Sequence, residues 1–203
     1  MTTDRRALED LLGDVAVGHV AFVDDDGGPV VIPTAVVLDG ERLLLHGSSG
    51  SRWMRRLATG VPVSMAVTAV DGVVVARTAF ESSLHYRSAV LFGCCRPVPV
   101  AELDAALALI TERLIPGRVS EVRASTRREL AATSVLGMAV ESWSLRVSAG
   151  PPTDEPDDVA GPAWAGTLAI ERRYAAPVPA PDLRGGRDLP GSVRALVAER
   201  VRL

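Results

Sequence analysis

The sequence contains no lysine, no asparagine and no glutamine, so all 22 of its basic residues are arginines. The absence of lysine excludes the phosphate-loop motif of ATPases, because that motif needs a lysine beside its glycines. It also excludes a Schiff base to a carbonyl substrate or to a pyridoxal cofactor, because that bond forms on a lysine amine. Whatever anion this chain binds, arginine forks and backbone amides must hold it.

Cysteine is almost absent, and the two that are present, Cys94 and Cys95, are neighbours in the sequence. Adjacent residues of a strand point to opposite faces, so a disulfide between these two would be strained. A pair of free thiols in a reducing compartment is the simpler interpretation, and a redox role is the alternative.

Long hydrophobic runs are also missing. No apolar stretch reaches the roughly 18 residues that a membrane-spanning helix needs, and the first 14 residues are charged throughout. The formal net charge of −3 is opposite to the basic surface that nucleic acids require. We therefore expect a cytoplasmic protein that binds neither a membrane nor nucleic acid.

Short apolar runs rich in valine make up most of the first hundred residues, and Asp-Gly turn signals separate several of them. Six strands are predicted in this way, at 18–23, 29–38, 41–46, 62–70, 73–80 and 85–100. Asp71-Gly72 is predicted to be a hairpin turn, and a further strand is expected over 134–147. Strands without alternating helices indicate a mainly β fold, a barrel or a sandwich with peripheral helices, rather than a Rossmann sheet.

Helical spacing of apolar residues predicts helices at 3–15, 100–114, 126–132 and 191–201, with a short one after Gly50. The stretch 149–162 is rich in proline and acidic residues and is expected to be an exposed connection. The predicted organisation is an N-terminal helix (1–17), a barrel domain with inserted helices (18–148), and a proline-rich connection with a closing strand and a tail packed on the same domain (149–203).

The stretch 46–56 carries the clearest chemical signal. It leads from a strand through small hydroxyl residues into a helix that bears Arg52, Arg55 and Arg56. Free backbone N–H groups at a helix N-terminus bind anions, and arginines add charge, so a phosphate site is indicated. The alternative is an ordinary serine cap beside a solvated basic face. The nucleophile elbow of serine hydrolases is excluded, because the window that starts at Gly47 ends in Ser51 instead of glycine.

Four motifs together resemble a known family: GHVAFVDDDGGPVVIPT, LLLHGSSGSRWMRRL, HYRSAVLFG and PAWAG, spread over about residues 7–170. They are similar to the flavin-nucleotide-binding members of the pyridoxamine phosphate oxidase-like split barrels, which are related to nitroimidazole-resistance proteins. The resemblance implies a six-stranded antiparallel FMN-binding split barrel. It also implies a homodimer that holds FMN at or near the subunit interface.

The same resemblance assigns the cofactor-binding residues. Val31, Ile32, Pro33 and Thr34 would lie beside the flavin ring, and His46, Gly47, Ser48, Ser51 and Arg52 would surround the phosphate. Tyr86, Arg87 and Ser88 would complete the pocket from another strand, although Arg87 is also placed to pair with a surface carboxylate. Trp164 would lie near the flavin or the dimer seam, or else in the core.

The sequence departs from the true pyridoxamine phosphate oxidases, because no Trp-x-x-x-Arg-Leu pattern follows Trp164. Pyridoxamine phosphate is therefore doubtful as the substrate. His19, His46 and His85 show no metal-ligand spacing, so no metal site is predicted. Each of them begins or ends a predicted strand, where it could donate a hydrogen bond to a flavin or be satisfied by backbone.

Two functions of different classes follow. The first is an FMN-dependent oxidoreductase that reduces a small organic acceptor, with the flavin supplying the electron chemistry. The second is a binding module without turnover, which holds a flavin, a deazaflavin or a haem. No catalytic residue and no particular small-molecule substrate can be named from the sequence.

Overall fold

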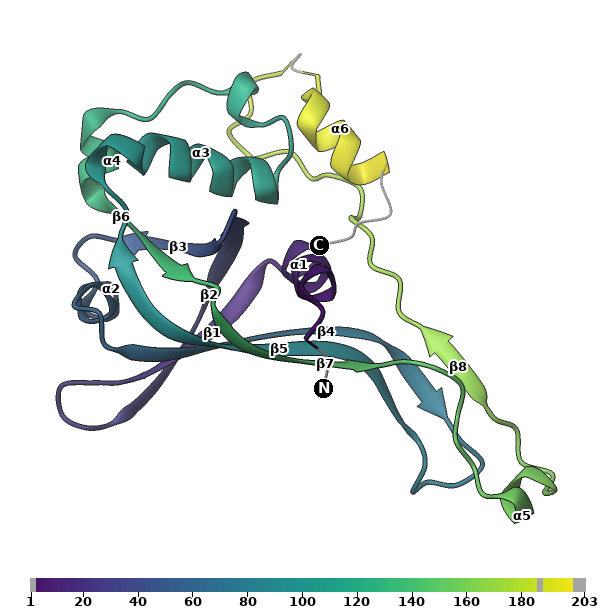
Figure 1. Cartoon of the computed structure of the whole chain (residues 1–203). Helices are drawn as coiled ribbons and strands as arrows, with labels where there is room; N and C mark the ends of the chain where they lie inside the picture. Colours follow the sequence, from purple (N-terminus) through teal and green to yellow (C-terminus); the bar gives the residue numbers. More distant parts are fainter. Residues whose placement is uncertain (1–2, 186–187, 199–203) are drawn as a thin grey trace.

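The computed structural model describes residues 3–185 and 188–198, and its centre is a closed ring of six antiparallel strands (Figure 1). Around the ring the order is β5-β6-β3-β2-β1-β4, and the ladder between β4 and β5 closes it. The six strands are β1 (Val17–Val23), β2 (Pro29–Asp39), β3 (Arg42–Ser48), β4 (Pro62–Val75), β5 (Ser83–Pro97) and β6 (Thr133–Ala139). The prediction of a mainly β split barrel with peripheral helices is confirmed.

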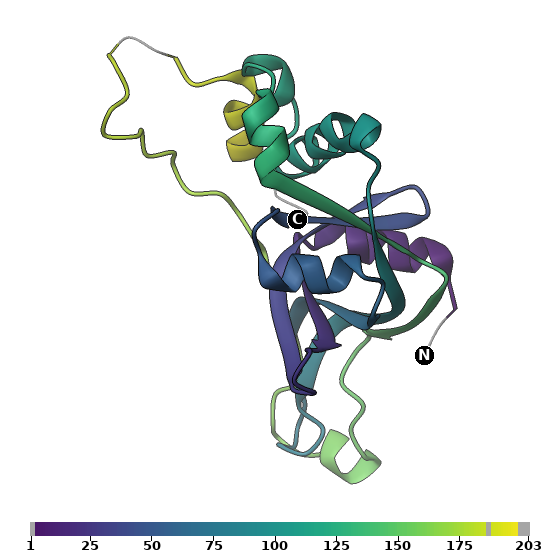
Figure 2. The same cartoon turned by 90° about the vertical axis from the view of Figure 1, so that its left-hand side faces the viewer.

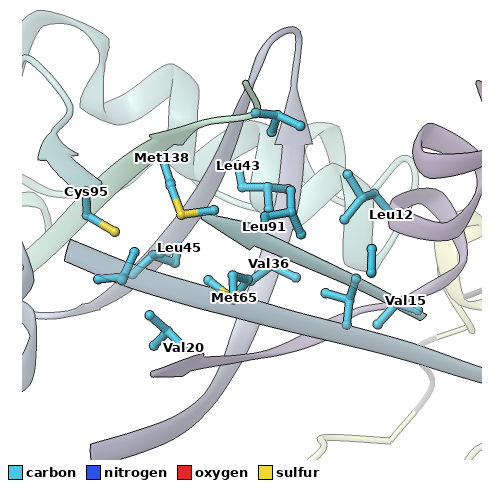
Figure 3. Packing of buried hydrophobic residues seen from close by; sticks show 14 of the residues in the cluster. Leu12, Val15, Val20, Val36, Leu43, Leu45, Met65, Leu91, Cys95 and Met138 are labelled. Atoms are coloured by element: carbon cyan, nitrogen blue, oxygen red, sulfur yellow. The ribbon is translucent and has the colours of Figure 1, made fainter. Parts of the chain in front are cut away.

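Alternating residues of the ring strands fill its interior, as the period of two in a strand requires. Val20, Leu45, Met65 and Leu91 have no exposed surface and meet at the centre (Figure 3). Helix α1 (Arg5–Asp14) adds three more buried leucines to this core. It begins where predicted, because the Asp4 carboxylate accepts hydrogen bonds from the first free amides of the helix.

The strands β4 and β5 run on past the ring and form an arm, which Figure 1 shows at its lower right. Strand β7 (Ser142–Ser148) pairs with β5, and β8 (Gly166–Ala169) pairs with the outer end of β4. A short helix, α5 (Pro156–Val159), lies in the connection between β7 and β8 at the tip. We call the outer halves of β4 and β5, together with β7, α5 and β8, the arm.

The prediction of a hairpin turn at Asp71-Gly72 is wrong, since both residues lie inside the single strand β4. They form a bulge in the β4–β5 ladder, where the register shifts between Val70 and Gly72. The Asp71 carbonyl accepts the Ile170 N–H, and its carboxylate binds Arg87 on β5, so both polar groups are used within the sheet. The predicted fourth and fifth strands are therefore one strand, and the chain reverses later, at 76–82.

The single strand expected over 134–147 is two strands that pair in different places. Strand β6 bridges β3 and β5 and completes the ring, whereas β7 lies on the arm. Between them Val140 leaves the ladder, and its N–H donates to the Glu41 carbonyl. The ring contains six strands as predicted, but not the same six.

The predicted helices at 100–114 and 126–132 are present as α3 (Leu103–Leu114), which a 3₁₀ turn precedes, and α4 (Arg127–Ala132). Helix α3 covers the outside of the ring and forms a second, smaller core with β2, β3 and β6. The short helix after Gly50 is α2 (Arg52–Ala58), which packs on β3, β5 and β6. Figure 2 shows α3 and α4 together above the barrel, with α2 apart from them across its side.

Both cysteines are free thiols, and they lie on opposite faces of β5 as neighbours in a strand must. Cys95 is fully buried, and this burial raises the pKa of its thiol to about 11. No helix within residues 3–185 and 188–198 has both the length and the apolar character to cross a membrane.

The segment after β8 is extended and exposed as far as residue 185, and α6 (Gly191–Ala198) then returns to the barrel. The Glu121 carboxylate holds the start of α6, because it accepts the N–H and the hydroxyl of Ser192 at 3.0 and 2.5 Å. These bonds, the hydroxyl bond first, lower the pKa of Glu121 below its ordinary value of 4.5. Ser192 is the buried polar residue on which this attachment depends.

We expect replacement of Glu121 by glutamine to loosen α6, because the amide accepts the two Ser192 bonds less strongly than a carboxylate does. In the wild-type protein the contact holds above pH 4.5 and weakens as the pH falls through the lowered pKa. Amide hydrogen exchange over 191–198, corrected for intrinsic rates, should therefore show less protection in the variant at pH 7. It should also show a loss of protection at low pH in the wild type alone. Equal protection in both proteins at pH 7 contradicts the assignment.

Candidate functional site

The chain passes from β3 into α2 through a turn that its own polar groups stabilise. The Ser49 N–H donates to the Ala132 carbonyl at 2.9 Å, and the Ser51 N–H donates to the Ser48 carbonyl at 3.0 Å. Gly47 permits the close packing of α2, because a Cβ there would lie 2.9 Å from Met54. No side-chain cap bond is made by Ser51 at the start of α2. The turn is thus fixed in shape while the first turn of α2 lacks a serine cap.

A pocket of about 250 Å³ opens beside α2, between this helix and the turn that joins β1 to β2. Phe22, Val30 and Trp53 form its apolar wall, while Arg52 and Arg56 supply its positive charge. Arg52 and Arg56 are four residues apart and therefore lie one helical turn from each other on the same side of α2. Of the five residues that the sequence assigns to a phosphate, only Arg52 lines this pocket, and the carboxylates of Asp24 and Asp25 line it too.

The carboxylates that balance these arginines come from the β1–β2 turn, not from the neighbouring sequence. Arg56 pairs with Asp25 at 3.0 Å and also donates to the Val23 carbonyl. Arg52 reaches Asp26 only at 3.5 Å, and its side chain is 72% exposed. Exposed pairs of this kind contribute about 0–1 kcal/mol, so an incoming phosphate can displace Asp26 from Arg52.

The stretch that the resemblance places beside a flavin ring is divided between two faces of β2. Val31 and Pro33 are exposed on the outside of the sheet, opposite Ala21 and His19 of β1. Ile32 and Thr34 alternate to the other side, where Ile32 packs against the core. Only the backbone of these two residues remains to contact a ligand on the outer face. Strand β1 pairs with one edge of β2. Strand β3 pairs with the other edge only from Val36 onwards, so this second edge has no strand partner over 30–34 among the described residues.

The three histidines lie in different surroundings. His46 lies on β3 opposite Val135, and its Nδ1 is buried with no hydrogen-bond partner among the described residues. His19 is exposed on the outer face of β1. His85 lies on the arm, where its Nε2 is 2.8 Å from the Gly150 carbonyl, so this nitrogen carries the proton. An unsatisfied buried nitrogen makes His46 the one of the three that a ligand group would complete.

Tyr86, Arg87 and Ser88 lie on β5 where the arm begins, opposite Val70, Ala69 and Thr68 of β4. Tyr86 faces outward, and the Arg146 guanidinium of β7 lies 5.7 Å from its ring centre. Arg87 faces the other way and binds Asp71 through two bonds of 2.9 and 2.7 Å. It also donates to Asp14 of α1 at 2.7 Å. Arg87 therefore pairs with carboxylates, which is the alternative role that the sequence offered for it.

This three-residue cluster shifts the titration of its members. The Arg87 guanidinium is the main reason that the pKa of the Asp71 carboxyl lies below its ordinary value. The hydrogen bonds from Arg87 to Asp71 likewise raise the pKa of the guanidinium, against the effect of partial burial. Arg87 thus stays charged, and its donors are occupied by Asp71 and Asp14.

Trp164 is not a core residue, since its side chain is 68% exposed. Its ring lies over Gly166 at the start of β8, where a Cβ would approach the ring atoms to 2.7 Å. Strand β8 pairs with the outer end of β4, at Gly72–Val75. Trp164 therefore belongs to the arm.

The predicted residues form two groups that are far apart within one chain. β4 begins soon after α2, at Pro62, and Tyr86 pairs with Val70. At about 3.3 Å for each strand residue, Tyr86 lies roughly 25 Å along β4 from its start, and Trp164 lies roughly 40 Å along it. Tyr86, Arg87, Ser88 and Trp164 therefore do not line the α2 pocket within one chain.

The sequence interpretation missed most of the pocket wall. Phe22, Val30 and Trp53 were not singled out, and neither was Asp25, although all four lie inside the two motifs quoted for the resemblance. A signal was present, because three consecutive aspartates in the DDDGG turn precede β2. Within the described residues, no group of three or more histidine, cysteine or acidic side chains is arranged to hold a metal ion.

The chain is similar to known proteins in both sequence and structure. Residues 4–147 match the sequence profile of the family described as pyridoxamine 5′-phosphate oxidase. The structure of the FAD and heme binding protein from Mycobacterium smegmatis is similar at a TM-score of 0.92 and 46% identity, over 97% of this chain and 96% of that one. No curated protein matches the chain.

Two further solved structures are similar. The flavocytochrome Anf3 from Azotobacter vinelandii has a TM-score of 0.88 and 28% identity, and the match covers 96% of this chain and 91% of that one. A 5-nitroimidazole antibiotic resistance protein from Bacteroides thetaiotaomicron has a TM-score of 0.59 and 16% identity, over 71% of this chain and 84% of that one. This last likeness is one of fold alone.

Proposed function

Since the chain belongs to the pyridoxamine 5′-phosphate oxidase family, we propose that it binds a flavin nucleotide at the α2 pocket and uses it as an oxidoreductase. The observation that supports this proposal is the open pocket beside Arg52, Trp53 and Arg56, on the helix whose arginines the sequence predicts to hold an anion. Had protein side chains filled that pocket, the flavin interpretation would have no binding site to start from.

The residues present fit a flavin in three respects. Arg52 and Arg56 offer charge to phosphate, and Phe22, Val30 and Trp53 offer apolar contact. The unpartnered Nδ1 of His46 offers a hydrogen bond on the β3 side of the turn. Pockets that hold a whole ligand usually measure about 300–1,000 Å³, so the α2 pocket is large enough for the phosphate end alone. The ring would then extend from the pocket along the edge of β2 over 30–34 that has no strand partner among the described residues.

FMN carries one phosphate and FAD carries two, so the number of phosphates that the pocket can bind distinguishes the two flavins. The sequence predicts FMN, whereas the 46%-identical relative is named for FAD and heme. Two arginines one helical turn apart can meet the two phosphates of a dinucleotide, each through a charge-assisted contact. We therefore propose FAD in preference to FMN, and chromatography of the flavin released from the purified protein distinguishes the two.

We also propose that the protein works as a homodimer, in which the arm of one chain completes the pocket of the other. The separation of the α2 pocket from Tyr86, Ser88 and Trp164 within one chain supports this arrangement, because a second copy can bring the two groups together. The outer face of the sheet also exposes Val17, Val31 and Phe92, at 46%, 59% and 48%. Exposed apolar side chains gathered on one face are typical of an interface.

A bound flavin would supply the electron transfer, and the chain would supply binding and orientation. Arg52 and Arg56 would hold the phosphates, and the free edge of β2 over 30–34 would present backbone groups to the ring. His19, exposed opposite Pro33, lies on the outer face of the sheet. Its role would be to hydrogen-bond the ring or a substrate bound beside it.

A second candidate is haem binding, because the relative from Mycobacterium smegmatis is named for heme as well as FAD. His19 is exposed and His46 carries a free nitrogen, so the chain has imidazoles that could serve as axial ligands. In this reading the protein is a flavin and haem module, and turnover is not its function.

One experiment separates these functions. The visible spectrum of freshly purified protein should show a flavin band, and light scattering after size exclusion should give twice the mass of one chain. A Soret band in the same spectrum supports the haem candidate. Reduction of nitro, quinone or azo compounds with NADH or NADPH supports the oxidoreductase, and a flavin-loaded protein that stays inactive supports the module. A colourless monomer that gains no flavin on incubation with FMN or FAD rules the proposal out.

A further inference from the structure

A cavity of about 750 Å³ lies apart from the α2 pocket. It is an open cleft between α1, the bulge of β4, the C-terminal end of α3 and the segment that follows β8. We call it the α1 cleft, and none of the residues that the sequence assigns to a flavin lines it except Arg87. We propose that the α1 cleft is a second binding site, for a small organic dianion such as a phosphate monoester or a dicarboxylate.

Three arginines from three separate elements carry this proposal. Arg6 comes from α1, Arg113 from α3 and Arg172 from the segment after β8, and all three line the cleft. Within residues 3–185 and 188–198, none of the three has a carboxylate at ion-pair distance, although Arg172 lies near enough to Asp71 to affect its titration. Guanidinium groups without partners around one cavity favour an anion with several oxygens.

The acidic residues of the cleft are mostly engaged elsewhere. Asp14 and Asp71 both bind Arg87, at 2.7 Å in each case, and Glu9 pairs with Arg5 at 2.8 Å. Asp10 is the remaining carboxylate, and it faces three unpartnered guanidinium groups. The lining contains four arginines and four acidic residues, so its formal charges balance. Among the lining side chains that form no ion pair with another described residue, however, three are arginines and one is an aspartate, so this part of the cleft is positive.

The geometry of the cleft is built in. The Arg113 guanidinium of α3 reaches α1, where its Nη2 lies 3.4 Å from the place that a Cβ on Gly13 would occupy. Arg87 also lines the cleft, and Asp14 and Asp71 hold its guanidinium in place. Ala69, Val70 and Ile170 add a small apolar surface.

The size and the lining define the ligand class. A volume of about 750 Å³ exceeds what an inorganic ion needs and lies in the usual range for small organic ligands. Alanine, valine and isoleucine can contact a short carbon body, while the guanidinium groups bind its anionic ends. A long polyanion is disfavoured, because Asp10 and the acidic chain as a whole repel it.

The test is calorimetric titration of the flavin-loaded protein with two probes, glycerol 3-phosphate and succinate, at constant ionic strength. We expect at least one of them to bind with a Kd below about 1 mM. Replacing both Arg113 and Arg172 by alanine should weaken this binding at least tenfold. Arg173→Ala is the matched control, since Arg173 is next in the chain but pairs with Glu171 and does not line the cleft, and it should bind as the wild type does.

The two probes distinguish a phosphate ester from a dicarboxylate, and either supports the site. Absence of binding by both probes overturns the proposal, as does unchanged binding in the double variant. If the double variant does not fold, Arg172→Ala alone decides, because Arg172 is exposed. The titration is repeated on Arg52→Ala, whose α2 pocket lacks its outer cation. Binding retained there shows that the α1 cleft acts independently, whether or not the chain binds a flavin.

Discussion

Arg52→Ala should lower the affinity for a flavin about 10- to 150-fold, which corresponds to roughly 1.5–3 kcal/mol, the usual contribution of a charge-assisted contact. Arg52 lines the α2 pocket, and its ion-pair partner among the described residues is Asp26 at 3.5 Å. The wild-type side chain is therefore available to phosphate, and the variant leaves Arg56 as the single cation of the pocket. Fluorescence quenching of FMN and of FAD by the apoprotein measures the change.

Two variants make this result specific. Arg55→Ala removes an exposed arginine of the same helix that does not line the pocket, so affinity should change by less than about twofold. Asp26→Ala frees Arg52 from its competing carboxylate, so affinity should stay the same or rise. If Arg52→Ala binds flavin as well as the wild type does, the phosphate is held elsewhere and the α2 pocket is not the site.

Arg87→Met should destabilise the fold by about 2–3 kcal/mol, because it leaves two partly buried carboxylates without their cation. Arg87 joins α1 to the bulge of β4 through Asp14 and Asp71, and its side chain is 23% exposed. Urea denaturation at pH 7 measures the loss. Arg146→Met, on the outer face of β7, should cost less than about 1 kcal/mol, since it loses one cation–π contact with Tyr86.

The effect of Arg87→Met should also depend on pH in a defined direction. Arg87 lowers the pKa of Asp71 below its ordinary value of 3.8, so the pair stabilises the folded protein above that pH. As the pH falls through the lowered pKa, Asp71 takes up a proton and the contribution disappears. The difference in stability between wild type and variant should therefore be constant from pH 7 to about 5 and should shrink near pH 3. A constant difference down to pH 3 contradicts the assignment.

The same variant bears on the predicted role of Arg87 in flavin binding. Arg87 points to the α1 side of β5, whereas Tyr86 and Ser88 point to the outer face. We expect the flavin affinity of the folded variant to change by less than about threefold, unlike that of Arg52→Ala. A large loss in both would place Arg87 in the flavin site after all.

The period of two in the apolar runs predicted a mainly β fold, a barrel or a sandwich, and the family resemblance singled out the split barrel. Residues such as Val20, Met65 and Leu91 alternate inward in the ring, as that period requires. Local signals placed the helices equally well, because caps such as Asp4 and Thr126 act on the residues that follow them directly. These features depend on contacts within a few residues or on a simple repeat.

What the sequence could not predict depends on residues far apart in the chain. Asp71-Gly72 has the composition of a hairpin turn, but Arg87 and Ile170 bind Asp71 within the sheet and turn it into a bulge. The break between β6 and β7 has no glycine or proline to mark it, since it arises from pairing with two different regions. The α2 pocket was located from its arginines, whereas its acidic partners Asp25 and Asp26 come from another turn.

The place of β6 in the ring has a consequence for synthesis. Strand β6 joins β3 to β5, so the ring stays open until Thr133–Ala139 has been added. A ribosome must therefore synthesise about two thirds of the chain before the ring can close. Until then, the apolar face of hairpins such as β1–β2 remains exposed to solvent. Nascent chains halted before this point should bind chaperones that recognise hydrophobic surface, and chains halted well beyond it should escape them.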